Sequence, residues 1–163
     1  MIKQYENGQQ LQAGILNGVN KLADNVASTL GPRGRNVIIH RKDRSPFITK
    51  DGVTVAKFIE LEDPFENAGA QIIKQAASQT NTNAGDGTTT STVLAREILN
   101  HSQRYLMAGA SPVELKRGIE KAVAGICDSL EEMATPVSDL GDIEHIATIS
   151  ANGDTVIGEM IAT

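Results

Sequence analysis

The segment AGDGTTTST, residues 84–92, separates two strongly helical patterns and so decides how this part of the chain folds. It combines two glycines, one carboxylate and a run of hydroxyl side chains, and it comes directly before the apolar-periodic residues 93–99. Before it, apolar residues recur at helical spacing from Phe65 to Ala77 and give way to a polar run at residues 79–83. The pattern predicts two helices joined by a loop that is a candidate ligand-binding segment.

Helical patterns continue on both sides of this segment. Residues 9–30 carry an apolar helical period that Gly31 and Pro32 close, and another pattern runs from Val93 to Leu106. The next helix has Ser111 as N-cap, Pro112 at its first position and Glu114 completing a capping box. The apolar residues predicted to form its buried face are Leu115, Ile119, Ala122, Val123, Ile126, Leu130 and Met133.

One part of the chain shows β-like rather than helical patterning. Two short runs, residues 36–40 and 46–49, are joined by the charged residues 41–45, which predicts a hairpin. A turn at residues 50–52 then leads into a short helical segment that reaches Ile59. The fold class expected from these patterns is mainly α with one small β-hairpin.

The composition limits the class of protein. The 163 residues are 40% apolar, with three Phe, two Tyr and no Trp, so we expect a folded chain with an aliphatic core. A net charge of −5 and the scarcity of aromatic rings argue against a nucleic-acid partner. The N-terminus has no apolar signal region and no window has the length of a membrane span, so we expect a cytoplasmic protein without membrane association.

The cysteine and the histidines give little indication of a catalytic or metal-binding site. The single cysteine, Cys127, lies one helical turn from Val123 and Leu130, so we expect a buried thiol rather than a nucleophile. The histidines at positions 40, 101 and 145 share no ligand-like spacing. No metal site is predicted on them.

The opening segment has the features of an anion site. A helix N-terminus presents unpaired N–H groups and a partial positive charge, so the loop before Val93 can accept an anion. Gly85 and Gly87 allow close backbone approach, and threonine hydroxyls can donate to phosphate. Asp86 would repel a phosphate unless a cation such as Mg²⁺ lies between them, which predicts a metal-bound nucleotide. A simpler interpretation, in which Asp86 and the threonines only cap the helix, stays open.

Two other segments support the nucleotide hypothesis. Residues 29–32 form a second helix end broken by glycine, and residues 50–52 place a carboxylate in a tight turn. Neither the Gly-x-x-x-x-Gly-Lys-Ser/Thr loop nor a Gly-x-Gly-x-x-Gly loop after a strand is present. Residues 86–88 resemble a loop of haloacid-dehalogenase-like phosphatases, but Ala84 stands where that family needs its nucleophilic aspartate. The phosphatase hypothesis is therefore rejected.

Eight segments, spread in one order over nearly the whole chain, carry a family resemblance: residues 18–20, 22–24, 29–37, 48–53, 60–67, 85–90, 115–119 and 148–152. In these segments the sequence resembles the N-terminal part of a group I chaperonin, the GroEL and Hsp60 family. The resemblance implies that residues 1–132 form the N-terminal half of an equatorial ATP-binding domain, a helical bundle with a small β-hairpin. Residues 133–163 would begin the intermediate domain.

The same resemblance implies a set of site residues and ligands. The ligands are ATP and Mg²⁺, with K⁺ as a further cation near Lys50. Asp51 would act as the catalytic residue that positions or activates the attacking water, and Asp86 would bind Mg²⁺. The nucleotide-binding residues implied are Thr29, Leu30, Gly31, Pro32, Lys50, Asp86, Gly87, Thr88, Thr89, Thr90 and Ser150.

The functional hypothesis that follows is an ATP-hydrolysing chaperone that folds client proteins. Its partners would be identical subunits in a ring, with unfolded clients and a co-chaperonin lid binding an apical domain that these residues do not include. Because the helix that starts near Asp154 has no stop signal before Thr163, we expect the chain to be part of a longer protein. Two alternatives are a naturally short assembly partner or decoy of full-length rings without its own turnover, and a piece that does not fold stably alone.

Overall fold

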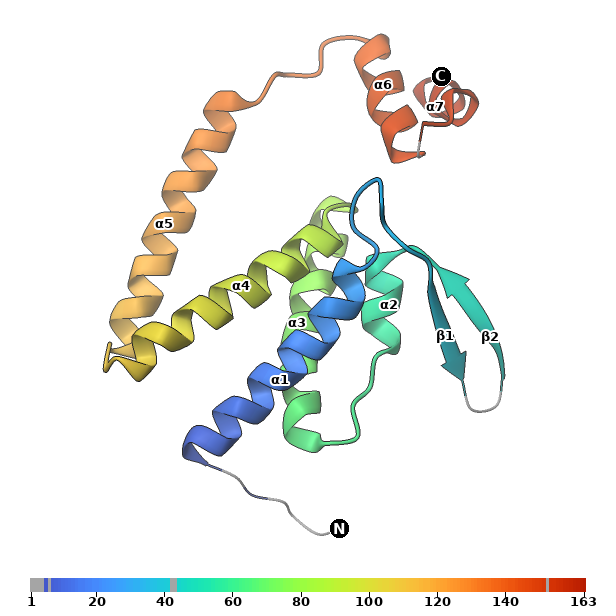
Figure 1. The fold of residues 1–163 in the computed structure, drawn as a ribbon. Coiled ribbons are helices and arrows are strands. Elements are labelled where there is room, and N and C mark those ends of the chain that lie inside the picture. Colours follow the sequence, from blue (N-terminus) through green and yellow to red (C-terminus); the bar gives the residue numbers. More distant parts are fainter. Residues whose placement is uncertain (1–4, 6, 42–43, 152) are drawn as a thin grey trace. The chain divides into compact units, whose positions relative to one another are not determined.

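The structure is a computed structural model that describes residues 5, 7–41, 44–151 and 153–163. The chain divides into two compact units, Met1–Pro112 and Val113–Thr163, which are described separately. The first unit holds four helices and a two-stranded sheet: α1 (Gly8–Ala27), β1 (Val37–Arg41), β2 (Arg44–Thr49), α2 (Gly52–Phe58), α3 (Pro64–Ala84) and α4 (Thr88–Met107) (Figure 1). The predicted mainly α class with a small hairpin is confirmed.

Helices α1, α3 and α4 pack together and α2 closes one end of their core. The buried hydrophobic side chains are aliphatic, as the composition predicts, and Leu22 and Ile73 are the largest of those fully removed from solvent. They come from successive turns of each helix, so the helical period of the sequence identifies the packed face. The core cluster consists of Val19, Leu22, Val26, Val55, Ala56, Ala70, Ile73 and Ala77.

Two glycines allow α1 and α3 to approach closely. A Cβ built on Gly18 would overlap the main-chain carbonyl of Glu66, and one built on Gly69 would overlap that of Ile15. The obstacle in each case is backbone of the other helix, which cannot rotate away as a side chain can. Glycine at both positions therefore sets the spacing between the two helices.

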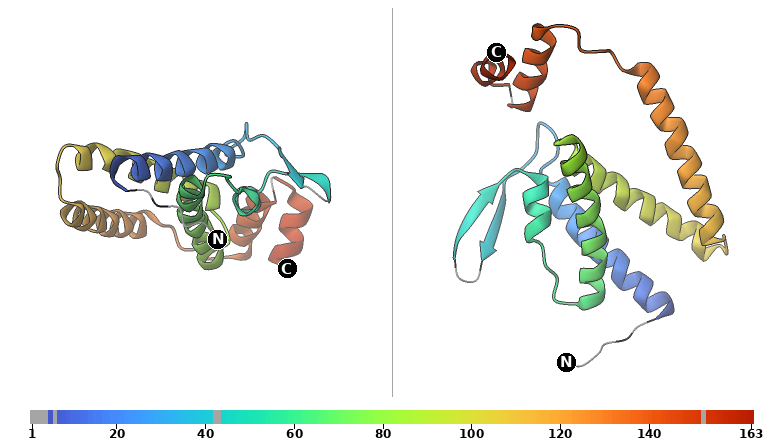
Figure 2. Two further views of the ribbon diagram at one scale, coloured as in Figure 1. Left: turned by 90° about the horizontal axis from the view of Figure 1, so that it is seen from below. Right: turned by 180° about the vertical axis from the view of Figure 1, so that it is seen from behind.

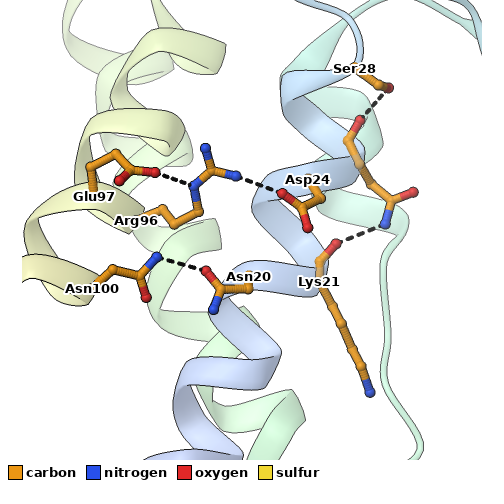
Figure 3. A network of polar contacts seen from close by, with 8 residues as sticks. Asn20, Lys21, Asp24, Ser28, Arg96, Glu97 and Asn100 are labelled. Atoms are coloured by element: carbon orange, nitrogen blue, oxygen red, sulfur yellow. Dashed lines mark hydrogen bonds and ion pairs between the residues drawn. The ribbon is translucent and has the colours of Figure 1, made fainter. Parts of the chain in front are cut away.

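Polar contacts fix α4 against α1. The Arg96 guanidinium donates to the Asp24 carboxylate over 2.6 Å and to Glu97 over 2.9 Å, and the Asn100 amide donates to Asn20 over 2.9 Å (Figure 3). Such contacts are specific in direction, although exposed ion pairs add little to stability. The network links α4 to α1 at these positions, in addition to the apolar packing of Ala95 and Leu99 against the core.

The hairpin lies beside α2 and extends away from the other helices of the first unit in both views of Figure 2. Ile38 pairs with Ile48 and Ile39 with Phe47 in the antiparallel register. Strand β1 has the predicted length but is shifted by one residue, and β2 begins two residues earlier than predicted. The Phe47 ring meets Phe58 of α2 edge to face with 5.1 Å between centroids. Residues 42 and 43 of the predicted connector lie outside the described residues.

Three helix boundaries differ from the sequence-based prediction. Helix α1 ends at Ala27 rather than near Leu30, because Ser28 and Thr29 donate their hydroxyls to carbonyls of the last turn. Helix α3 continues through the polar run to Ala84, where Thr80 and Thr82 donate to carbonyls four residues earlier. Helix α4 begins at Thr88, not Val93. In α3 and α4 the polar residues belong to the helix, because their hydroxyls donate to helix carbonyls, and they do not mark a break.

The second unit contains α5 (Pro112–Met133), α6 (Leu140–Ser150) and α7 (Thr155–Ala162). The sequence analysis did not predict α6, whereas the cap of α7 is confirmed by Asp154, which accepts from the N–H groups of Val156 and Ile157. Helix α6 packs on α7, where Gly158 fits against Thr148. Asn152, in the last segment of the family resemblance, lies outside the described residues.

Helix α5 forms as predicted, but its apolar face is not buried. None of its residues, all of which the structure describes, is buried, and Ile126 and Leu130 are more than half exposed at 58% and 59%. Cys127 is exposed as well, so the expectation of a buried thiol is wrong. An amphipathic period identifies which face of a helix can pack, whereas it does not supply the surface that would cover it.

Candidate functional site

Three connections between elements meet at one pocket of about 230 Å³ in the first unit. They are the segment after α1, the turn between β2 and α2, and the link between α3 and α4. The residues that line the pocket are Thr29, Leu30, Gly31, Lys50, Asp51, Gly52, Asp86, Gly87, Thr88, Thr89 and Thr90. The structure thus brings together three segments that lie far apart in the sequence.

Two predicted site residues do not line this pocket. Pro32 is exposed in the turn that follows Gly31. Ser150 is the exposed last residue of α6 and belongs to the second unit. The role of Ser150 stays a prediction that follows from the family resemblance.

The link between α3 and α4 is tight because both of its glycines adopt left-handed backbone. Gly85 has φ of 72° and ends α3, and Gly87 has φ of 77° and precedes the first turn of α4. Residues with a side chain rarely take this conformation. Asp86 therefore lies between the two glycines, two residues before the first residue of α4.

The first turn of α4 presents unpaired main-chain donors to the pocket. The earliest N–H of α4 that bonds within the helix is that of Ser91, which donates to the Gly87 carbonyl over 2.9 Å. The N–H groups of residues 88–90 precede it and have no partner within the helix. Together with the helix dipole they favour an anion at this end of α4.

Asp86 is only partly engaged by its own loop. One carboxylate oxygen, Oδ1, accepts from the Gly87 N–H over 2.6 Å. The structure gives no hydrogen bond to Oδ2 in the described part of the chain. This contact is not a helix cap, because Gly87 is the N-cap residue and α4 has no side-chain cap hydrogen bond. The other oxygen is available for a ligand.

The hydroxyls of the opening segment divide into two groups. Ser91 and Thr92 donate back to the Thr88 carbonyl over 2.9 and 2.8 Å, so they belong to the helix and not to a ligand site. The Thr89 hydroxyl lies 3.5 Å from the hydroxyl of Thr29, and both residues line the pocket. Thr89 therefore joins the first turn of α4 to the segment that follows α1.

Asp51 is the N-cap of α2 and reaches the pocket from the β2–α2 turn. Its Oδ2 accepts from the Thr54 N–H over 3.0 Å and also from the Thr54 hydroxyl. Its own N–H donates to the Thr49 hydroxyl over 3.0 Å. These contacts hold the carboxylate in one place while the residue stays exposed to water.

The charges around the pocket favour a cation together with an anion. Lys50 contributes one positive charge, and Asp51 and Asp86 contribute two negative charges. A polyphosphate entering this pocket alone would meet a net repulsion from the side chains, which a divalent cation removes. Carboxylate oxygens are the ligands that Mg²⁺ prefers, and it commonly combines one or two of them with substrate phosphates. The donor set fits Mg²⁺ carried in with a phosphate ligand.

The sequence analysis did not single out two residues of this site. Gly52 lines the pocket, and Thr54 holds Asp51, although neither was among the predicted site residues. The available signal for Thr54 was the spacing of an N-cap aspartate and a hydroxyl three residues later. Gly52 gave no separate signal, because its role depends on Thr89 from another helix.

Replacing Gly52 with alanine is expected to disturb the site without unfolding the chain. A Cβ at this position would overlap the Thr89 hydroxyl, which would have to leave its place beside Thr29. On the nucleotide hypothesis of the sequence analysis, ATP affinity is expected to fall about tenfold, as measured by calorimetric titration. Gly118→Ala on α5, where nothing lies within 4 Å of the new Cβ, is the matched control. Equal affinities of the two variants would contradict the proposed contact.

Comparison with known proteins gives two findings. The family model described as TCP-1/cpn60 chaperonin family matches residues 22–163. Among solved structures, the chain is similar to the chaperonin gp146 from the bacteriophage EL 2 (Pseudomonas aeruginosa), determined in the presence of ATP-BeFx. The two share 32% sequence identity with a TM-score of 0.76, and the match covers 95% of this chain and 28% of the phage protein.

No helix among the described residues is long and apolar enough to cross a membrane.

Proposed function

This chain belongs to the TCP-1/cpn60 chaperonin family, and from that premise we propose that its pocket binds ATP with Mg²⁺ as part of an ATP-hydrolysing chaperonin. The observation that carries the proposal is the convergence of the unpaired N–H groups of α4 with the carboxylates of Asp51 and Asp86. The phage chaperonin to which the chain is similar was crystallised with ATP-BeFx. That nucleotide supports the same class of ligand here.

The phosphates would lie at the first turn of α4. Main-chain N–H groups of residues 88–90 would donate to phosphate oxygens, and the Thr90 hydroxyl, which is exposed, can add a further donor. Lys50, which also lines the pocket, would contribute positive charge. Leu30, 48% exposed at the pocket, offers apolar surface for the nucleoside.

Asp86 is the residue that would hold Mg²⁺. Its free Oδ2 can ligate a cation while Oδ1 remains bonded to the Gly87 N–H, so metal binding needs no rearrangement of the loop. Bound Mg²⁺ supplies neutralisation of the charge that develops on the phosphate oxygens. K⁺ near Lys50 would be a secondary ligand of the same pocket.

Asp51 would orient the attacking water. Its carboxylate is exposed, lines the pocket and is fixed by contacts to its own helix turn. A carboxylate in this position can accept a hydrogen bond from water and place it in line with the γ-phosphate. Phosphoryl transfer to water depends chiefly on such positioning.

The wider function proposed is ATP-driven folding of client proteins by a ring of identical subunits. The chain spans 28% of the length of the phage chaperonin, so ring assembly, client binding and a co-chaperonin lid are proposals for the protein in which these residues act. We also propose that residues 1–132 form the N-terminal half of an equatorial domain and that residues 133–163 begin an intermediate domain. No specific observation favours the alternative of a short assembly partner or decoy.

The test of this proposal is ATP binding by the natural gene product in its native assembly. Asp86→Asn is expected to weaken binding at least tenfold when Mg²⁺ is present, because a neutral amide replaces a charged ligand of the cation. The measurement is calorimetric titration with ATP in Mg²⁺ and again in EDTA, where the variant should bind at least as tightly as the wild type because one repelling carboxylate has been removed.

The matched control is Asp128→Asn, which removes an exposed carboxylate from α5 and should leave affinity unchanged. If the wild type binds no ATP, the proposed function is wrong. If it binds ATP equally well in Mg²⁺ and in EDTA, the role of Asp86 as the magnesium ligand is wrong.

A further inference from the structure

We propose that Thr54 is a positioning residue whose hydroxyl orients the Asp51 carboxylate for ATP hydrolysis. This inference rests on the proposed function, because it assigns a partner to the residue that would orient the water. Thr54 does not line the pocket, so it would act through Asp51 and not on the nucleotide.

The contact between the two side chains exceeds what the helix needs. An N-cap carboxylate is satisfied when it accepts one N–H from the second or third helical residue. The Thr54 N–H already meets that need over 3.0 Å. The Thr54 hydroxyl nevertheless donates to the same atom, Oδ2. The second donor adds no further cap and instead restricts rotation of the carboxylate.

The restriction acts on both sides of Asp51. On the main-chain side, the Asp51 N–H donates to the Thr49 hydroxyl over 3.0 Å. In the side chain, Oδ2 accepts from both the N–H and the hydroxyl of Thr54. A carboxylate held in this way cannot exchange its two oxygens by rotation about χ2 without breaking two bonds.

The second oxygen of Asp51 is left for another partner. Among the described residues, the structure gives no hydrogen bond to Oδ1. Since Asp51 is exposed at the pocket, Oδ1 is the atom that would accept a hydrogen bond from the attacking water. Thr54 thus keeps Oδ2 bonded to the protein and leaves Oδ1 to bind the water.

The hydroxyl of Thr54 can be removed with little change of shape. Thr54→Val keeps the N–H cap and the branched side chain but loses the second donor to Oδ2, and Thr54→Ser retains that donor. For Thr54→Val we expect kcat to fall at least tenfold while the affinity for Mg·ATP stays within twofold, because a freely rotating carboxylate presents the wrong geometry. Thr54→Ser should recover at least half of the wild-type kcat.

The experiment is steady-state ATPase kinetics and calorimetric Mg·ATP binding on the natural gene product in its native assembly. The variants are Thr54→Val, Thr54→Ser, Asp51→Asn and the double variant, with Thr82→Val as the control for loss of a helix-bonded hydroxyl. If Thr54 acts through Asp51, the valine substitution has no further effect on kcat once Asp51→Asn is present. Thermal unfolding of each variant identifies any general loss of stability.

The outcomes separate this inference from the proposed function. If Asp51→Asn lowers kcat strongly while Thr54→Val does not, the positioning role is wrong and the role of Asp51 stands. If Thr54→Ser is as impaired as Thr54→Val, or if the valine effect persists in the double variant, the hydroxyl does not act through Asp51. If Asp51→Asn keeps wild-type kcat, the hydrolytic role proposed for Asp51 fails first.

Discussion

Replacing Asp51 with asparagine is expected to reduce ATP turnover by about 10²- to 10⁴-fold while leaving Mg·ATP binding nearly unchanged. Asparagine has the same shape and is an equally good N-cap, so the start of α2 and its contact with the Thr54 N–H should persist. The change removes the negative charge that would accept a proton or orient a water. The loss should therefore appear in kcat and not in the affinity for nucleotide.

The measurement is phosphate release by the natural gene product in its native assembly, paired with calorimetric titration of Mg·ATP. Asp63→Asn is a matched control, because Asp63 is also an exposed aspartate N-cap, accepts from the N–H groups of Phe65 and Glu66, and lies outside the pocket. It should retain full turnover. Wild-type turnover in Asp51→Asn would remove Asp51 from the mechanism.

Replacing Gly18 with alanine is expected to destabilise the first unit by about 2–3 kcal/mol, the upper part of the range for overpacked sites. The new Cβ would overlap the Glu66 carbonyl, so α1 and α3 would have to separate along their whole contact. The side chains nearest to the crossing, Val19 and Leu22, would lose close packing. An alanine would otherwise favour the helix by about 1 kcal/mol, which makes a net loss diagnostic of the clash.

Gly14→Ala on the same helix is the matched control. Its Cβ would lie 3.3 Å from the Cβ of Phe65, a side-chain contact that a small adjustment relieves. We expect its stability to stay within about 1 kcal/mol of wild type. Urea unfolding of the 163-residue chain, followed by circular dichroism, should show a midpoint lowered by about 1–2 M for Gly18→Ala. Equal midpoints for the two variants would show that α1 and α3 do not cross at Gly18.

Local signals in the sequence predicted most of the elements correctly. The periods of α1, α3, α4 and α5 were visible because side chains on one helix face recur every three to four residues. The hairpin and the cap at Asp154 were also predicted, since turns and caps depend on residues that are neighbours in the chain. Helix ends were predicted less accurately, because the threonines at the end of α3 and at the start of α4 donate to helix carbonyls as readily as they form loops.

The sequence by itself determined the helical class of this protein, the glycine-flanked Asp86 and the two other segments of the site. Only the tertiary structure decided that these three segments meet at one pocket, because their approach depends on how α1, α3 and α4 pack. The same holds for Gly18 and Gly69, whose role exists only where two backbones come together. The tertiary structure also decided the environment of α5, because its pattern predicted a buried face that the structure leaves exposed. Periodicity is a property of one segment, whereas burial and convergence are properties of pairs of segments distant in the chain.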